Sequence, residues 1–188
     1  MFFVRRPSPA TLDEILDQAR TADPTYAAVG ATNGADWPAG YRHDFDEGLL
    51  GTGAETFDRA VSALRRWKAH TGAGTEVFPR GATVAEGEVE LLLIHAAGLW
   101  TVAPFRIVYV VREPDLFRFA YGTLPGHPEQ GEASFAVVRS ETDDVSFRLA
   151  SFSRPVDPLA RLAKPLARRI QRRYTLAYIE ALREAIAE

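Results

Sequence analysis

Residues 75–152 contain short segments in which apolar and polar side chains alternate, and this pattern constrains the fold more than any other feature of the chain. A period of two is typical of β-strands, because successive side chains of a strand point to opposite faces of the sheet. Most connections between the segments are short. Strands joined by short connections usually pair as antiparallel neighbours, so the sequence predicts an antiparallel meander.

Two short helices are predicted ahead of these strands. Thr11 and Glu14 have the spacing of a capping box, which predicts an amphipathic helix over residues 11–20. Thr52 and Glu55 repeat this spacing, and the apolar residues that follow recur at helical intervals. We predict that this second helix continues until Thr71-Gly72 ends it. The glycine-rich region between the two helices is predicted to form loops whose aromatic residues pack onto the rest of the protein.

A longer helix is predicted over residues 157–187, where apolar side chains form a stripe. Pro165 either kinks this helix or starts its main part. Most of its basic residues lie opposite the stripe, as on a solvated helix face. Arg173 differs, because the helical repeat places it among apolar side chains, where an unpaired guanidinium is costly. We expect it to form an internal ion pair, to extend toward solvent, or to bind a negative group of a ligand.

These elements predict a single α+β domain over residues 1–188. A meander with one apolar face needs a cover, and a long amphipathic helix has the right shape to lie across it. The expected architecture is therefore a curved antiparallel sheet with two short helices and a long carboxy-terminal helix that closes it. A chain of 188 residues, 46% of them hydrophobic, is large enough to form one substantial core.

The composition excludes several classes of function. The chain has no cysteine, so it forms neither a disulfide nor a thiolate metal site, and it has no cysteine nucleophile. Its net charge of -3 gives no reason to expect nucleic acid as a partner. No apolar segment approaches the roughly 20 residues of a membrane span. The amino terminus lacks the pattern of a signal peptide, so we expect a cytoplasmic protein.

Sequence motifs for common cofactors are absent as well. The chain contains no phosphate loop, no dinucleotide-binding glycine pattern between a strand and a helix, and no nucleophile elbow. We therefore predict no cofactor. The sequence leaves the oligomeric state open.

Residues 121–132 combine turn-forming residues with ionisable groups. His127, Glu129 and Glu132 lie within six positions, whereas a hairpin connection needs only residues such as glycine or asparagine. These three side chains can cap backbone amides and face solvent, contact a ligand, or hold a metal ion. Because no second histidine lies nearby, the spacing matches no metal motif and we predict no metal. If Glu132 pairs with an arginine beneath the long helix, the segment belongs to a site; otherwise it is a turn.

Motifs along nearly the whole chain resemble those of a bacterial and plant family of unknown function. They are rich in aromatic, glycine and proline residues and comprise Tyr26-x-x-Val29-Gly30-x-Thr32, Pro38-Ala39-Gly40-Tyr41, Leu50-Gly51-x-Gly53-x-x-x-Phe57, Trp67, Pro104-Phe105-Arg106-Ile107-Val108-Tyr109, residues 121–132, and Phe152-Ser153-Arg154-Pro155. The order of helices and strands also resembles the helix-grip fold of the START-like, or SRPBCC, superfamily. This resemblance implies a cavity between the sheet and the closing helix that holds a small apolar or amphipathic molecule.

Aromatic and charged residues near such a cavity are candidates for ligand binding. Alternation places Phe105, Ile107 and Tyr109 on one face of a strand and Arg106 on the other, without showing which face is inward. Arg154 lies where the sheet leads into the closing helix, within reach of Glu132. The candidate ligand-binding residues are Tyr41, Arg106, Tyr109, Tyr121, His127, Glu129, Glu132, Arg154 and Arg173.

We expect a binding protein rather than an enzyme, because the titratable residues lie in a loop without a recognisable pair of nucleophile and base. Two alternatives remain open. One is an enzyme in which His127 or Glu132 transfers a proton and an arginine stabilises negative charge. The other is an interaction scaffold without a small-molecule site.

Overall fold

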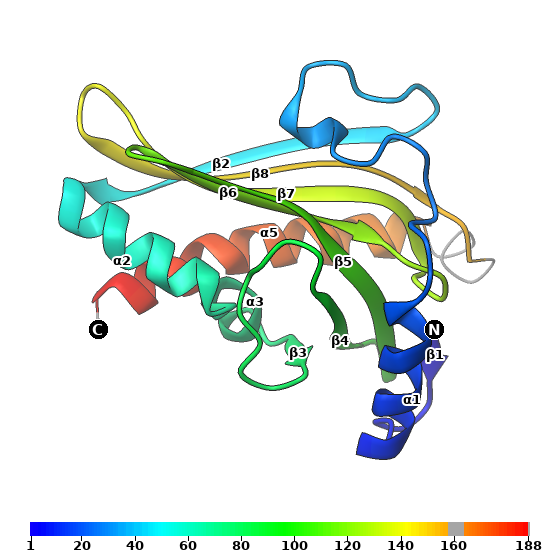
Figure 1. The fold of residues 1–188 in the computed structure, drawn as a ribbon. Helices are drawn as coiled ribbons and strands as arrows, with labels where there is room; N and C mark the ends of the chain where they lie inside the picture. The colour runs from blue at the N-terminus through cyan, green and yellow to red at the C-terminus, as the bar shows by residue number, and fades with distance from the viewer. Residues whose placement is uncertain (158–163, 188) are drawn as a thin grey trace.

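A curved antiparallel sheet forms the body of the molecule (Figure 1). The computed structural model describes residues 1–157 and 164–187, with the side chains of residues 1–157, 174 and 176–187. The strands are β1 (Phe2–Phe3), β2 (Arg42–Thr52), β3 (Glu76–Phe78), β4 (Val89–Ala96), β5 (Leu99–Glu113), β6 (Leu116–Thr123), β7 (Glu129–Arg139) and β8 (Asp144–Pro155). The helices are α1 (Pro9–Arg20), the 3-10 helix η1 (Ala31–Asn33), α2 (Ala54–Arg65), α3 (Lys68–Gly72) and α5 (Lys164–Ala187). The α+β fold predicted from the sequence is confirmed.

The strands pair in the order β2-β8-β7-β6-β5-β4-β3, and β1 pairs with β5. From β4 to β8, each strand is antiparallel to the next one along the chain, which confirms the predicted meander. The sequence analysis is wrong about β2, whose residues it assigns to loops. Asp44, Asp46 and Glu47 lower the strand propensity of this segment. Because β2 is an edge strand paired with β8, these side chains reach solvent.

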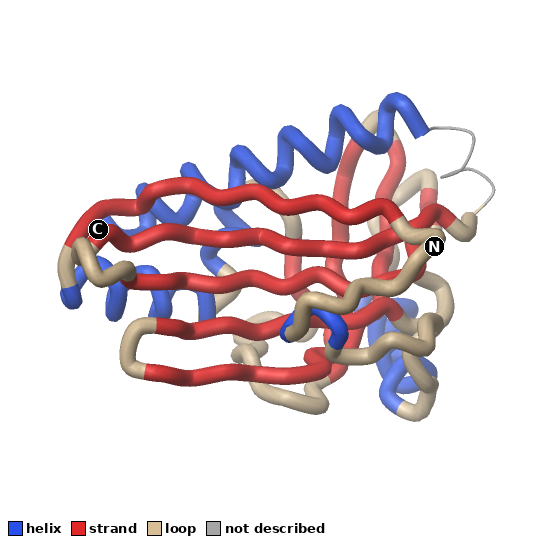
Figure 2. Tube along the Cα trace, turned by 90° about the horizontal axis from the view of Figure 1, so that it is seen from above, coloured by secondary structure: helices blue, strands red, loops and turns tan. Residues whose placement is uncertain are grey.

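The sheet has an inner and an outer face. Helices α2, α3 and α5 lie against the inner face, whereas a segment containing η1 lies on the opposite side of the sheet (Figure 1). We call this segment, residues 25–41, the outer cover. Figure 2 looks onto the outer face and shows the outer cover crossing the strands, with the long helix behind them. Helices α2, α3 and α5 and the outer cover are thus separated by the thickness of the sheet (Figure 1).

The larger hydrophobic core lies on the inner face, where Phe105, Phe119, Phe135 and Phe147 are almost completely buried. The smaller core lies between α1 and the outer face of β4 and β5, and it consists of Leu12, Leu16, Ala19, Val89, Leu91, Leu93, Val102 and Leu124.

Helix α1 begins earlier than predicted. Its cap is Ser8, whose side chain accepts a hydrogen bond from the backbone N–H of Thr11 at 3.2 Å.

A β-bulge in β5 decides which of its residues face inward. The register against β6 shifts between Ile107 and Tyr109, so Val108 is an extra residue. Phe105 and Ile107 belong to the inner core, and Tyr109 lies on the outer face. The predicted shared face of these three residues is therefore wrong for Tyr109, because simple alternation does not reveal an inserted residue.

The predicted second helix is interrupted at Trp67. Helix α2 ends at Arg65, Trp67 has a left-handed backbone conformation with φ of 61°, and α3 then begins at Lys68. This conformation costs a bulky residue about 1–3 kcal/mol, and residues that adopt it cluster at functional sites. The predicted capping box at Thr52 is also absent, because Gly53 occupies the cap position of α2 without a side-chain hydrogen bond.

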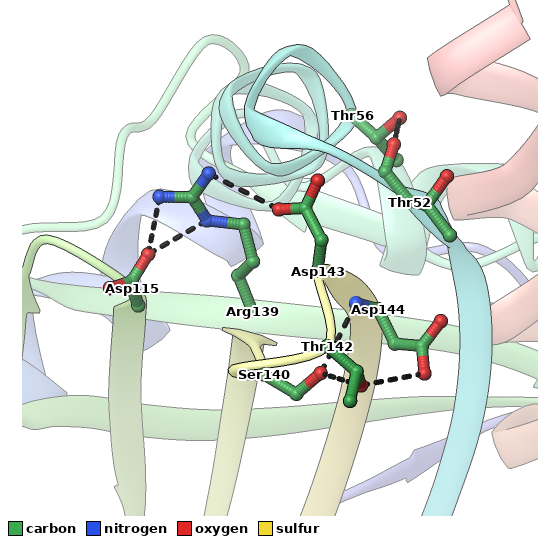
Figure 3. A network of polar contacts seen from close by, with 8 residues as sticks. All are labelled: Thr52, Thr56, Asp115, Arg139, Ser140, Thr142, Asp143 and Asp144. Atoms are coloured by element: carbon green, nitrogen blue, oxygen red, sulfur yellow. Dashed lines mark hydrogen bonds and ion pairs between the residues drawn. The ribbon is translucent and has the colours of Figure 1, made fainter.

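A polar network fastens two turns at one end of the sheet (Figure 3). Arg139 on β7 forms ion pairs with Asp115 in the β5–β6 turn, at 2.6 Å, and with Asp143 in the β7–β8 turn, at 3.4 Å. Within the β7–β8 turn, Ser140 Oγ accepts a hydrogen bond from the backbone N–H of Asp144 at 3.1 Å. These groups are mostly exposed, so we interpret the network as a fixation of the turns.

Candidate functional site

Aromatic rings gather between the inner face of the sheet and the helices. The inner cluster consists of Trp67, His70, Phe105, Tyr121, Phe135 and Tyr178. The break between α2 and α3 directs Trp67 and His70 toward the sheet, and α5 contributes Tyr178. The His70 ring centroid lies 4.7 Å from that of Trp67, 4.8 Å from Tyr178 and 4.9 Å from Phe135. Aromatic side chains from the sheet, from the α2–α3 break and from α5 thus surround the imidazole of His70.

His70 is completely buried, and neither of its ring nitrogens has a hydrogen-bond partner among the described residues. Burial lowers the pKa of His70 from 6.5 to about 3, so the ring is neutral at physiological pH. The indole N–H of Trp67, a residue that is 2% exposed, is also unpartnered within the described part of the chain. Leaving a buried polar group without a partner costs about 1–3 kcal/mol. Two such groups in contact are therefore unusual in a native core.

A buried carboxyl group lies beside this cluster. Glu90 is 2% exposed, and it faces inward on β4 as the cross-strand neighbour of Phe105. No described residue forms a hydrogen bond with either of its carboxyl oxygens. Burial, and to a lesser degree the nearby Glu88, raises the pKa of Glu90 from 4.5 to about 8. The indole N–H of Trp67 opposes this shift without reaching hydrogen-bond geometry. Glu90 is therefore mostly uncharged at neutral pH.

Two clefts open beside the loop that connects β3 and β4. The first has a volume of about 340 Å³, and Trp67 is part of its lining. The second has a volume of about 300 Å³, and Glu90 is part of its lining. Pro79, Gly81 and Ala82 line both clefts. Each cleft thus contacts one of the unpartnered polar residues of the interior.

On the outer face of the sheet, both carboxylate oxygens of Glu132 accept hydrogen bonds. Glu132 on β7 is 3% exposed and fastens the outer cover to the sheet. Its Oε2 accepts hydrogen bonds from Tyr26 Oη at 2.6 Å and the Gly30 N–H at 2.7 Å. Its Oε1 accepts from the Thr32 N–H at 2.9 Å and also from the Thr32 hydroxyl. Burial and the hydrogen bond to Glu132 raise the pKa of Tyr26, which therefore remains a neutral donor.

In residues 1–157 and the described part of α5, no group of three or more metal-ligating side chains is placed to hold a metal ion. The same part of the chain contains no helix that is long and apolar enough to cross a membrane.

Comparison with known proteins assigns the family. The family described as "Domain of unknown function (DUF1990)" matches residues 25–181. The chain belongs to the DUF1990 family. A UPF0548 protein from Deinococcus radiodurans is 35% identical over 200 residues, covering 97% of both chains. A UPF0548 protein from Dictyostelium discoideum is 27% identical and covers 99% of this chain and 96% of its own. The family resemblance stated from the sequence motifs is confirmed.

Solved structures extend the likeness of this DUF1990 protein at the level of fold. A hypothetical protein from Helicobacter pylori superposes with a TM-score of 0.57 at 14% identity, covering 80% of this chain and 94% of its own. The Zhui aromatase/cyclase from a Streptomyces species superposes with a TM-score of 0.54 at 13% identity, covering 78% and 94%. These similarities confirm the predicted helix-grip fold.

The outer cover explains a DUF1990 motif. The first motif has four defined positions. Three of them, Tyr26, Gly30 and Thr32, donate hydrogen bonds to Glu132, and the fourth is Val29. Tyr109 contacts the same group, because its hydroxyl lies 2.9 Å from Thr32 Oγ1. Burial raises the pKa of Tyr109. Of the residues predicted to bind a ligand, the structure thus brings Tyr109 and Glu132 together, but on the outer face.

Arg154 also lies on the outer side of the sheet, opposite helices α2, α3 and α5 (Figure 1). Its guanidinium stacks over the Tyr41 ring at 4.6 Å from the ring centroid, and its Nε donates to Gln130 Oε1 at 2.6 Å. Tyr41 in turn packs edge-on against Phe152. Arg154 does not pair with Glu132, although the sequence places it within reach, because backbone and hydroxyl donors of the outer cover occupy the carboxylate.

The remaining candidates are dispersed. Arg106 donates to the Arg20 carbonyl at 3.0 Å and thereby caps the carboxy-terminal end of α1. His127 lies in the β6–β7 turn, where its Nδ1 is 3.0 Å from the backbone N of Glu129, and burial lowers its pKa to about 4. Arg173 lies outside the residues whose side chains the structure describes. Among the predicted residues whose side chains the structure describes, only Tyr121 joins the inner cluster, where burial raises its pKa well above 10.

The sequence analysis misses His70, Glu90 and Tyr178 as candidates. One signal for Glu90 exists, because it shares a strand face with apolar Leu92 and Ile94, where a carboxylate is out of place. His70 follows Trp67 by three positions on an apolar helical pattern, which also places it inward. The contact between these two segments depends on the tertiary fold and has no local signal.

Proposed function

We propose that this DUF1990 protein binds a small apolar or amphipathic molecule between the inner face of its sheet and helices α2, α3 and α5. The observation that carries the proposal is His70, a completely buried imidazole without a hydrogen-bond partner among the described residues. Buried polar groups in native proteins are nearly always paired. A bound molecule that supplies the missing hydrogen bond accounts for the cost of leaving His70 in this position.

The surroundings of His70 support a ligand of this kind. Aromatic rings pack against the imidazole, and small-molecule sites are usually apolar with a few convergent polar groups. Trp67 supplies a hydrogen-bond donor, and uncharged Glu90 supplies both a donor and acceptors. The Zhui aromatase/cyclase also has the helix-grip fold, so this fold is compatible with a small-molecule site.

The hydrogen bonds of Glu132 and His127, the two residues considered for proton transfer, favour binding without catalysis. Four donors of the outer cover, from Tyr26, Gly30 and Thr32, converge on Glu132 and occupy both of its oxygens, so Glu132 is poorly placed to exchange a proton with a ligand. His127 is engaged with the backbone of Glu129 on the turn. Neither residue lies in the inner cluster.

Native mass spectrometry of the protein purified from its own host tests the proposal. We expect wild type to carry a small-molecule adduct that His70→Leu loses. When both proteins are compared free of ligand, the variant also removes an unpartnered polar group, so its free energy of unfolding should rise by about 1–2 kcal/mol. His43→Leu is the matched control, because His43 is exposed and its Nε2 lies 3.0 Å from the Pro38 carbonyl oxygen. An adduct retained by His70→Leu, or a lower stability of the ligand-free variant than of ligand-free wild type, contradicts the proposal.

A further inference from the structure

We propose that the two clefts beside the β3–β4 loop form the entrance to the interior site, and that the ligand is an amphipathic anion whose charged group binds Arg66 and Arg80. This inference rests on the proposed function and adds the route of entry and the charge of the ligand. Its carboxylate, phosphate or sulfonate would remain at the mouth while its apolar part reaches the inner cluster.

The clefts are separated by very little of the chain. Both are lined by Pro79, Gly81 and Ala82, which belong to the β3–β4 loop. Beneath the loop, Trp67 borders the first cleft and Glu90 borders the second, and these two side chains influence each other directly. Displacement of the loop would therefore join the clefts over the two unpartnered polar groups. Each volume is at the lower limit for small-molecule sites, and the joined cavity falls well within their range.

The loop is weakly attached along this stretch. The backbone N–H of Val84 donates to the Arg65 carbonyl at 3.3 Å, whereas that of Ala82 donates within the loop itself, to the Pro79 carbonyl at the same distance. Both hydrogen bonds are long. Val84 is buried and anchors one side of the loop, whereas Pro79 is exposed. The loop can thus move while β3 and β4 remain paired.

The mouth of the first cleft has an excess of positive charge. Arg66 and Arg80 are both exposed there, and neither forms an ion pair with any described residue. Glu76 is the one carboxylate that lines this cleft, and it is held by Arg6 at 2.5 Å. That hydrogen bond lowers the pKa of Glu76, and Arg80 adds to the effect without reaching ion-pair distance. Guanidinium groups bind carboxylate, phosphate and sulfonate oxygens in paired, charge-assisted hydrogen bonds.

Two fluorescent probes that differ by one charged group test the ligand class. N-Phenyl-1-naphthylamine is neutral, and 8-anilinonaphthalene-1-sulfonate carries the same rings with a sulfonate. We expect wild type to bind the sulfonate about tenfold more tightly than the neutral probe. The double variant Arg66→Gln/Arg80→Gln should lose this preference and keep its affinity for the neutral probe. Arg112→Gln, at the β5–β6 end of β5, is the matched control and should bind as wild type does.

The outcomes separate the two proposals. Failure of wild type to bind the neutral probe overturns the interior site itself. Equal affinity for both probes, or a preference that survives in the double variant, overturns the anionic ligand while the interior site stands.

The entrance is tested by obstruction of the loop. Ala82→Trp, which fills space lining both clefts, should slow association of the neutral probe at least tenfold in stopped-flow fluorescence. Ala82→Leu is a milder variant in case tryptophan prevents folding, and it should slow association to a smaller extent. A folded variant with the wild-type association rate shows that molecules enter elsewhere and overturns the assignment of the entrance.

Discussion

Replacement of Glu90 by glutamine tests whether the interior of this protein is uncharged. Glutamine has nearly the shape of a protonated glutamate, so Glu90→Gln should fold and should leave the inner cluster in place. The two side chains differ in one respect that matters here, because glutamate can release a proton and glutamine cannot. The pH dependence of stability therefore isolates the ionisation of Glu90.

The expected effect follows from the raised pKa of Glu90, which is about 8 in the folded state against an ordinary 4.5. Between these values the folded state binds one more proton than the unfolded state. The free energy of unfolding of wild type therefore falls, as pH rises, by about 1.4 kcal/mol per pH unit from this group. Glu90→Gln lacks this dependence. We expect both proteins to have similar stability at pH 5 and the variant to be more stable by about 3 kcal/mol at pH 8.

Urea denaturation of both proteins from pH 5 to pH 8, followed by tryptophan fluorescence, measures this difference. Burial lowers the pKa of His70, of His127 and of the Met1 ammonium group, so their titration stabilises the folded state as pH rises. These contributions are common to both proteins and cancel in the comparison. A difference that stays constant across the pH range would refute the reasoning, since Glu90 would then ionise at its ordinary pKa.

Two further predictions concern the outer face. Glu132→Gln leaves one acceptor oxygen where there were two. We expect a loss of about 3 kcal/mol in the free energy of unfolding and faster hydrogen exchange in residues 25–41. Unchanged exchange would show that Glu132 does not hold this segment. Gly122→Ala places a Cβ against the Tyr26 hydroxyl, and should cost about 1–3 kcal/mol by thermal denaturation. The control Gly34→Ala, where the nearest atom is 3.8 Å away, should change stability by under about 0.5 kcal/mol; equal effects contradict the packing argument.

The sequence is sufficient to predict the meander, because its strands alternate clearly and follow one another through short connections. It is not sufficient for β2, because acidic residues lower the strand propensity of this edge strand and its pairing with β8 depends on the tertiary fold. It is likewise insufficient at Val108, since an inserted residue in an apolar strand has no distinct sequence signal. The helical spacing through Trp67 predicts a continuous helix, and tertiary packing overrides it with a left-handed residue.

The candidate site shows the same limit. Residues 121–132 stand out because of their composition, yet the sheet directs their side chains to different places. Tyr121 points to the inner cluster, Glu132 to the outer cover, and His127 lies in the turn. The group that is now the best candidate is assembled from a helix break and a distant strand. Propensity and spacing carry no information about such a contact, whereas a single acidic residue on an apolar strand face does mark Glu90 as unusual.

The indole resonance of Trp67 provides the most direct test of an interior binding site. The chain has three tryptophans, so a ¹H–¹⁵N spectrum contains three indole N–H signals, which Trp→Phe variants assign. The Trp37 indole donates to the Gly34 carbonyl in the outer cover at 3.1 Å, and Trp100 packs at the smaller core. On addition of N-phenyl-1-naphthylamine we predict a shift of the Trp67 signal alone. A shift confined to Trp37 or Trp100 would locate binding on the outer face and contradict the account.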